Sequence, residues 1–232
     1  MCFPRQIISC LPAALLLLTA CARIPPPPTA TPPTADDVRH AVRALRELHR
    51  EHRYRDLVNR VVAGHSRPVA QFLTAVDEFE LANEKLCHWV RDQAGAGLAQ
   101  TIDQSYLLDD LGLYAGDDLG VFSRNVELLD VSFDGDQATL AYTATDRLPA
   151  RRVHLQRLAG AWRLAPASPV PESVSAAFRD WADALTHVRT HLERGGLTAA
   201  EIHDDPARLM ELVQARMRRG VTLLSQARGA GL

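Results

Sequence analysis

Two pairs of histidines have a spacing that could bring two imidazoles to one face of a helix. His49 and His52 are three residues apart, and His187 and His191 are four apart. Two imidazoles of the second pair, joined by Asp or Glu from another helix, could share a zinc ion. They flank Val188 at the border of an apolar stripe, which favours half-buried helix histidines over metal ligands. We assign no metal site, and metal binding by His187 and His191 stays an open alternative.

A six-residue pattern with paired aspartates occurs twice, and its two copies read Asp109-Asp110-Leu111-Gly112-Leu113-Tyr114 and Asp117-Asp118-Leu119-Gly120-Val121-Phe122. Carboxylate oxygens are ligands for hard cations, so a calcium site is one interpretation. The pattern lacks the alternating acids and the closing glutamate of a calcium loop. Aspartate and glycine turns between short apolar segments explain it equally well, and we favour them.

The chain carries no recognisable catalytic signature. It has no His-Glu-x-x-His, no phosphate-binding glycine loop ending in Gly-Lys-Ser/Thr, no Gly-x-Ser-x-Gly and no cysteine pairs with zinc spacing. We assign no catalytic residue and no cofactor, which favours a protein that is not an enzyme. The formal net charge of −2 gives no general attraction for nucleic acid.

The N-terminus has the order of a secretory signal. Arg5 is followed by an apolar run over 7–18, which is shorter than the roughly 20 residues of a spanning helix. The run ends in Leu18-Thr19-Ala20-Cys21, which resembles the lipobox of bacterial lipoproteins. In that family the signal peptide is cut before the cysteine, whose sulfur carries a diacylglyceryl group and whose freed amine is acylated.

This resemblance implies a location for the protein. Residues 1–20 would be removed, and Cys21 would anchor the chain in a membrane of the bacterial cell envelope, facing the periplasm. In enterobacterial lipoproteins an aspartate after the cysteine favours the inner membrane; the residue here is Ala22, which favours the outer membrane. Cys87 is the cysteine that remains free, and its place on the apolar stripe of a helix predicts a buried, inert thiol.

Residues 21–35 form the expected tether. The segment 24–33 reads Ile-Pro-Pro-Pro-Pro-Thr-Ala-Thr-Pro-Pro, a composition typical of polyproline II. At about 3.1 Å per residue this segment can hold a folded unit about 30 Å from the lipid.

The body of the chain predicts an α+β fold. Over 36–165 helical periodicity leads to four strands with period-two alternation, near 126–133, 138–144, 151–158 and 161–164. The helical stripe shifts phase near residues 52–54, which predicts one bent helix or two, ending at Gly64. Leu128 and Leu129 interrupt the alternation of the first strand, which indicates a bulge. This roughly four-stranded antiparallel meander has one apolar face, which helices before and after it can cover. Residues 166–232 predict two to three further helices, with a capping box at Thr198 and Glu201. We expect them to pack on the same domain.

Seven arginines between residues 39 and 60 could form a surface for nucleic acid or lipid headgroups. Glu47, Glu51 and Asp56 lie within one helical turn of these arginines. A solvated, salt-bridged face is therefore the favoured interpretation.

The last hairpin carries a second resemblance. Residues 158–164 read Leu-Ala-Gly-Ala-Trp-Arg-Leu, and with the preceding helices and strands they make residues 68–165 similar to nuclear transport factor 2-like domains. That resemblance implies a cone-shaped domain with a pocket between sheet and helices. The family contains both enzymes and non-catalytic binding domains, so no catalytic residue is transferred from it.

Three functions follow from these observations. The first is a lipid-anchored, non-catalytic module that binds another envelope protein. The second is a protein of nuclear transport factor 2-like type that holds a small apolar ligand in its pocket. The third is a hydrolase or isomerase that uses that pocket. We favour the first, because it needs only the anchor, the tether and the near-neutral charge.

Overall fold

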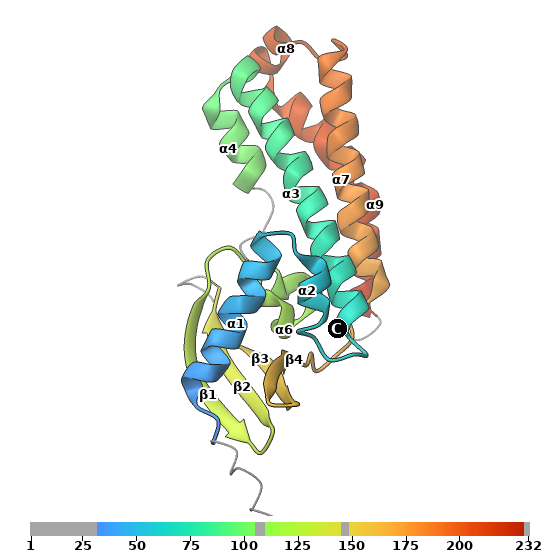
Figure 1. The fold of residues 1–232 in the computed structure, drawn as a ribbon. Helices are drawn as coiled ribbons and strands as arrows, with labels where there is room; N and C mark the ends of the chain where they lie inside the picture. Colours follow the sequence, from blue (N-terminus) through green and yellow to red (C-terminus); the bar gives the residue numbers. More distant parts are fainter. Residues whose placement is uncertain (1–31, 105–109, 145–148, 230–232) are drawn as a thin grey trace, which may run out of the picture. The chain divides into compact units, whose positions relative to one another are not determined.

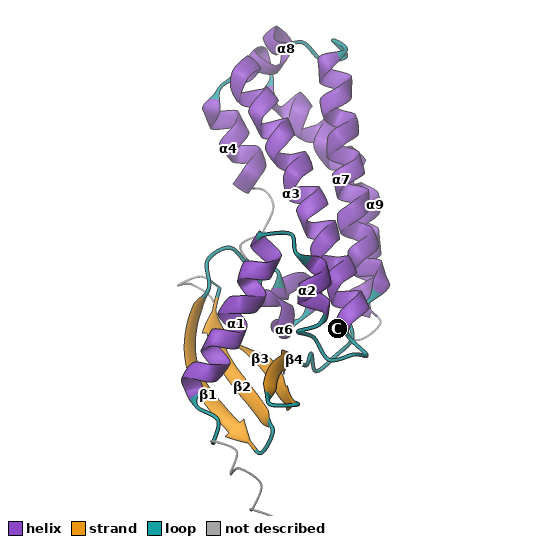
Figure 2. Cartoon of the chain, in the orientation of Figure 1, coloured by secondary structure: helices purple, strands orange, loops and turns teal. Residues whose placement is uncertain are grey.

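The computed structural model describes residues 32–104, 110–144 and 149–229. Along the chain, helices precede and follow an antiparallel sheet, so the predicted α+β class is confirmed (Figure 1 and Figure 2). Residues Pro33–Leu232 make up one compact unit. The signal peptide, Cys21 and most of the tether lie outside the described residues.

The first helix, α1 (Ala35–Arg50), begins with a capping box. The Thr34 hydroxyl accepts a hydrogen bond from the Asp37 amide, and the Asp37 carboxylate accepts one from the Thr34 amide. A tight turn separates α1 from the short helix α2 (Tyr54–Val58). The sequence left one bent helix or two as alternatives here, and the structure has two.

Four of the arginines between residues 39 and 60 are bonded within the protein. Arg46 donates to the carbonyl oxygens of Ser123, Arg124 and Val126, and Arg39 donates to that of Leu129. Arg50 pairs with Glu47, and Arg53 pairs with Glu51 and Asp56. These contacts agree with the predicted salt-bridged face.

Four strands make up the sheet among the described residues, in the order β1 (Glu127–Asp134), β2 (Gln137–Thr143), β3 (Arg151–Leu158) and β4 (Ala161–Leu164). Each strand pairs antiparallel with the next. The register shifts between Leu128 and Val131, where the sequence predicted a bulge.

One face of the sheet is filled by α1. Helix α1 packs against β1, β2 and β4. The buried side chains of this layer leave no open interior, because they pack against one another at close to zero exposure: Val38, Val42 and Leu45 from α1, and Leu140, Val153 and Leu155 from the strands.

The remaining long helices pack together. Helix α3 (Ser66–Ala94) runs along α7 (Glu172–Glu193), and α7 runs along α9 (Pro206–Gly229), as Figure 1 shows. The shorter α4 (Ala96–Gln104) packs on α3. Helix α8 (Ala199–Asp204) begins at the predicted capping box of Thr198 and Glu201. The C-terminal helices thus join the fold mainly through α3. From the sequence, these helices could also have covered the apolar face of the sheet.

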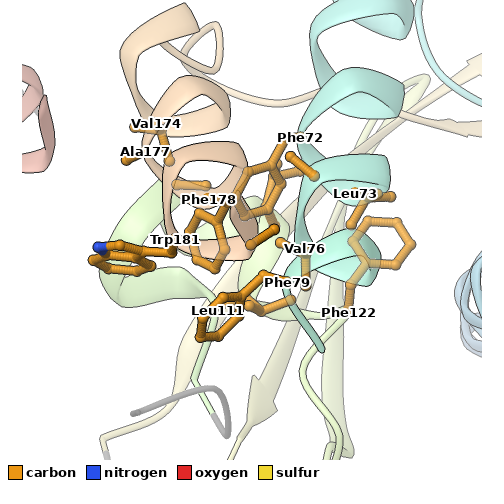
Figure 3. Close-up of a cluster of buried hydrophobic side chains, with 14 of the residues drawn as sticks. Phe72, Leu73, Val76, Phe79, Leu111, Phe122, Val174, Ala177, Phe178 and Trp181 are labelled. Carbon is orange, nitrogen blue, oxygen red and sulfur yellow. The ribbon is translucent and has the colours of Figure 1, made fainter. Parts of the chain in front are cut away.

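An aromatic cluster holds α3 and α7 together (Figure 3). The Phe178 ring lies 5.5 Å from Phe72, 5.8 Å from Phe79 and 5.2 Å from Trp181, measured between ring centroids. Tyr114 adds its ring from a different segment, 5.3 Å from Phe178.

Tyr114 belongs to the repeated aspartate pattern, which forms the short helices α5 (Gly112–Ala115) and α6 (Asp117–Gly120). The second aspartate of each copy is buried and bonded to β3. Asp110 lies 2.6 Å from Arg151, and Asp118 accepts hydrogen bonds from the His154 amide and the Ala167 amide at 2.7 and 2.8 Å. The repeat therefore attaches to the sheet through buried carboxylates.

The two copies also touch each other. A Cβ atom on Gly120 would lie 3.1 Å from Gly112 and would collide with the Tyr142 hydroxyl. That hydroxyl donates a hydrogen bond to the Asp117 carbonyl. Glycine is required at position 120 because no other residue lets Tyr142 reach this carbonyl.

In the described residues, the aspartates of the repeated pattern bind side chains and backbone amides of the protein itself. Asp110 and Asp117 both pair with Arg151, and Asp118 binds His154 and backbone amides. These contacts support the turn interpretation of the repeat over the calcium interpretation. Asp109 lies outside the described residues.

The two partners of Arg151 provide a matched test of burial. Asp110 is 3% exposed and Asp117 is 55% exposed. We expect Asp110→Ala to lower the free energy of unfolding by about 3 kcal/mol, because it leaves a buried guanidinium without its main partner. Asp117→Ala should cost less than about 1 kcal/mol, as exposed pairs do. Urea unfolding of both variants measures the difference, and equal losses would contradict the assignment.

Candidate functional site

A groove with a volume of about 790 Å³ runs along α3. It is bordered by α3 itself, by the start of α2, by Asp103 of α4 and by Arg124. A second hollow of about 440 Å³ adjoins it and shares four of its lining residues, namely His52, Asp77, Glu80 and Arg124. These shared residues are the centre of the candidate site.

Asp77 on α3 brings the first histidine pair together. Its Oδ2 lies 2.7 Å from His52 Nδ1, and its Oδ1 lies 3.2 Å from His49 Nε2. The His52 contact is a hydrogen bond, whereas the His49 contact has ion-pair distance without hydrogen-bond alignment. Because a carboxylate oxygen accepts hydrogen bonds, the His52 imidazole donates to Asp77 through Nδ1, which leaves Nε2 outside this contact.

The two imidazoles have different surroundings. The His49 side chain is 12% exposed and lies edge-on to Phe122, with ring centroids 5.5 Å apart. The His52 side chain is 67% exposed and lines the groove. Only His52 of this pair is therefore placed to meet a ligand from solvent.

The backbone at His52 is in the left-handed region, with φ of 54°. Its amide donates to the His49 carbonyl, and the Arg53 amide donates to the Leu48 carbonyl, both at 2.9 Å. These bonds form a Schellman motif, whose left-handed position is usually glycine. A histidine here carries a conformational cost, which its bond to Asp77 offsets in part.

The groove itself is rich in carboxylates. Among its lining residues five carboxylates face two guanidiniums, and the acids are Asp77, Glu78, Glu80, Glu84 and Asp103. Glu80 pairs with Arg124 at 3.3 Å, and Asp103 accepts a hydrogen bond from the buried Asn83 amide at 2.8 Å. Glu78 and Glu84 are exposed. The groove is thus suited to a positively charged ligand.

Two further groups give the groove a mixed character. Leu81 is 51% exposed, so the groove presents one large apolar side chain to solvent. The Tyr54 hydroxyl is buried and has no hydrogen-bond partner among the described residues. A ligand in the groove can therefore make apolar contact as well as polar contact.

Cys87 also borders the groove but is not reactive. It is 6% exposed, as the sequence predicted, and its thiol lies 3.6 Å from the Asn83 side-chain oxygen and the Ala99 carbonyl. Burial, with a smaller contribution from Asp103, raises the pKa of Cys87 to about 11. At neutral pH the group is a thiol, which is a poor nucleophile.

The second histidine pair does not converge. His187 Nδ1 donates to the Asp183 carbonyl at 2.7 Å, and the His191 ring packs against Gly196. Within residues 32–104, 110–144 and 149–229, no group of three His, Cys, Asp or Glu side chains could hold a metal ion. In the same residues no helix has the length and apolarity to cross a bilayer.

The sequence did not single out Asp77, Tyr54, Glu80 or Arg124. Asp77 lies 25 residues from His52, and Arg124 lies 44 residues from Glu80. No local spacing reports such contacts, because they form only when segments far apart in the chain pack beside α3. His49 and His52 were found by their spacing, but the carboxylate between them was not.

Comparisons of the chain with protein-family models, with curated proteins and with solved structures find no match.

The left-handed backbone at His52 generates a stability prediction. His52→Gly should leave the free energy of unfolding nearly unchanged, because relief of the backbone cost compensates for the lost bond to Asp77. His52→Ala loses the bond and keeps the cost, so it should be about 1 kcal/mol less stable than His52→Gly. Urea unfolding measures both variants. Equal stability of the two would show that the conformation at this position is not a constraint.

The pKa of Cys87 generates a second prediction. With a pKa of about 11 against an ordinary 9.0, its thiolate fraction at pH 8 is about 100-fold lower than that of an exposed cysteine. We expect Ellman's reagent to label Cys87, the one cysteine of residues 22–232, about 100-fold more slowly in the native protein expressed without residues 1–21 than in the same protein in urea. The native rate should rise with pH up to about 11. Equal native and unfolded rates would contradict the buried position.

Proposed function

We propose that this chain is a lipoprotein of the bacterial cell envelope that is anchored through Cys21 and binds another envelope component through the groove on α3. The observation that carries the binding role is the groove itself, which combines exposed Glu78 and Glu84 with exposed Leu81. The partner that fits this chemistry is a protein segment with positive charge and at least one apolar side chain.

The anchor is supported by the sequence. Leu18-Thr19-Ala20-Cys21 directly follows the apolar run, and the proline-rich segment after it suits a spacer. Two or more acyl chains on one residue hold a protein on a membrane, since each buried CH₂ contributes about 0.8 kcal/mol. The protein would face the periplasm, with the outer membrane favoured by Ala22.

The filled interior supports surface binding over a pocket under the sheet. Leu140, Val153 and Leu155 lie at close to zero exposure beneath α1. A small apolar ligand held as in nuclear transport factor 2-like domains would need open space at this layer. We therefore place the small-ligand function behind the binding module.

A hydrolase or isomerase is the second candidate, and it rests on one contact. The 2.7 Å bond from His52 to Asp77 orients the imidazole in an open groove, as a general base requires. The thiol of Cys87 cannot serve as its nucleophile in the neutral range, because its pKa is about 11. This candidate would use the groove and not the face of the sheet.

Replacement of the lipidated residue tests the anchor. The unaltered protein should sediment with membranes, and Cys21→Ser should move to the soluble fraction after a high-salt wash, because the acyl chains are lost. Fractionation of the native host with immunodetection measures this. A Cys21→Ser protein that has lost residues 1–20 and still stays in the salt-washed pellet would refute lipid anchoring through this residue.

Photocrosslinking in the host tests the groove. A benzoylphenylalanine at Leu81 should crosslink to a partner protein, and one at Val221 on α9 should not, although the two positions are 51% and 52% exposed. Glu84→Arg should weaken the Leu81 crosslink about ten-fold through charge repulsion. Glu211→Arg, an exposed site on α9, is the matched control.

The same experiment can refute the binding role. Equal crosslinking from Leu81 and Val221 would show that the groove is not selective. An unchanged yield in Glu84→Arg would show that the carboxylates do not attract the partner. Loss of the crosslink in Glu211→Arg would place the contact elsewhere.

A further inference from the structure

Helix α9 is attached to the fold along one narrow stripe. It packs on α7 and on the short α8. Its buried residues are spaced three or four apart and are Leu209, Val213, Met217, Gly220, Leu224 and Ala227. Gly220 brings the two helices close, because a Cβ there would lie 3.0 Å from the Ala177 carbonyl and would collide with the Trp181 indole. The opposite side of α9 remains exposed.

That exposed side is positively charged. Arg216, Arg218 and Arg219 are all exposed, and the sequence has no acidic residue after Glu211. Arg219 lies 3.4 Å from Asp180 of α7, but its side chain is 82% exposed, so this pair holds it only weakly. The second half of α9 therefore offers cations without acidic neighbours on the same helix.

Leucines accompany these arginines on one line of the helix. Leu212, Arg216, Arg219 and Leu223 follow one another at spacings of four, three and four residues, so they share a face. Both leucines are only partly buried. A shallow hollow of about 480 Å³ runs over this face and includes Arg216, Arg219 and Leu223. Its chemistry is a row of guanidiniums bordered by apolar side chains.

We propose that this face of α9 binds the anionic phospholipid surface of the membrane. Guanidinium groups bind phosphate oxygens in bidentate geometry, and partly exposed leucines can enter the headgroup boundary. An acidic protein would match the arginines but not the leucines beside them. The physiological setting rests on the proposed lipid anchor, which would keep the unit within reach of a bilayer.

The binding is electrostatic and additive over the arginines. Each arginine near an anionic surface strengthens binding about five-fold, and salt weakens the attraction. Three arginines cannot hold the protein on a membrane at high salt. They can select the side of the folded unit that faces the lipid, while the acyl chains of Cys21 supply the permanent attachment.

Vesicle flotation with the protein expressed without residues 1–21 tests the proposal in the absence of both the acyl anchor and the apolar run over 7–18. The protein should float with phosphatidylcholine vesicles containing about one third phosphatidylglycerol, and not with pure phosphatidylcholine vesicles. High salt should release it. The double variant Arg216→Gln/Arg219→Gln should lower the partition coefficient roughly 25-fold, about five-fold for each arginine.

The control is Arg55→Gln/Arg60→Gln, which removes the same charge from exposed positions outside α9 and should bind as the parent does. Equal loss in both double variants would show a general charge effect and would overturn the assignment to α9. So would equal binding to the two vesicle types, or binding to neither. A negative flotation result would not change the outcome of the Cys21→Ser fractionation. Membrane binding by α9 and lipid anchoring through Cys21 can therefore be refuted independently.

Discussion

The buried carboxylates of the aspartate repeat are the contacts on which the arrangement of this fold depends. Asp110 and Asp118 bind Arg151 and His154 of β3, which holds α5 and α6 against the sheet. The same segment places the Tyr114 ring 5.3 Å from Phe178 of α7. The repeat therefore joins the sheet to the helical layer. A buried ionised group demands a partner, so the geometry of this joint is narrowly specified.

Helix α3 carries the acidic groove that we propose as the binding surface. One side of it packs on α7 through the aromatic cluster (Figure 3). Another side carries Asp77 and the acidic groove. Asp77 is bonded to His52 at the end of α1, so the groove is lined by side chains from segments that meet only in the folded unit. A rigid helix is a better support for such side chains than a loop would be.

The two proposed surfaces differ in charge and in attachment. The groove on α3 is acidic, and its lining includes His52, whose backbone is in the left-handed region just after the end of α1. The outer face of α9 is basic and belongs to a helix that packs along one stripe. Opposite charges suit opposite partners, so one chain can contact a positively charged protein segment and an anionic lipid surface without competition between them.

Local sequence patterns determined the elements of this protein. The alternation in 151–158 predicted β3, the interruption at Leu128 predicted the bulge, and Thr198 with Glu201 predicted the start of α8. Each of these depends on neighbours within a few residues, which is why the sequence reports them. Helix α4 was missed, because glycines at 95 and 97 interrupt the pattern at its start.

Only the tertiary structure decided which polar groups meet. The sequence showed that Asp110, Asp118, His49 and His52 were candidates for chemistry, but it could not show that the aspartates bind β3 or that Asp77 lies between the histidines. These contacts join residues far apart in the chain, and their energy depends on burial, which no local pattern records. The lipidation of Cys21 is predicted by the sequence alone, whereas the two proposed binding surfaces are visible only in the folded unit.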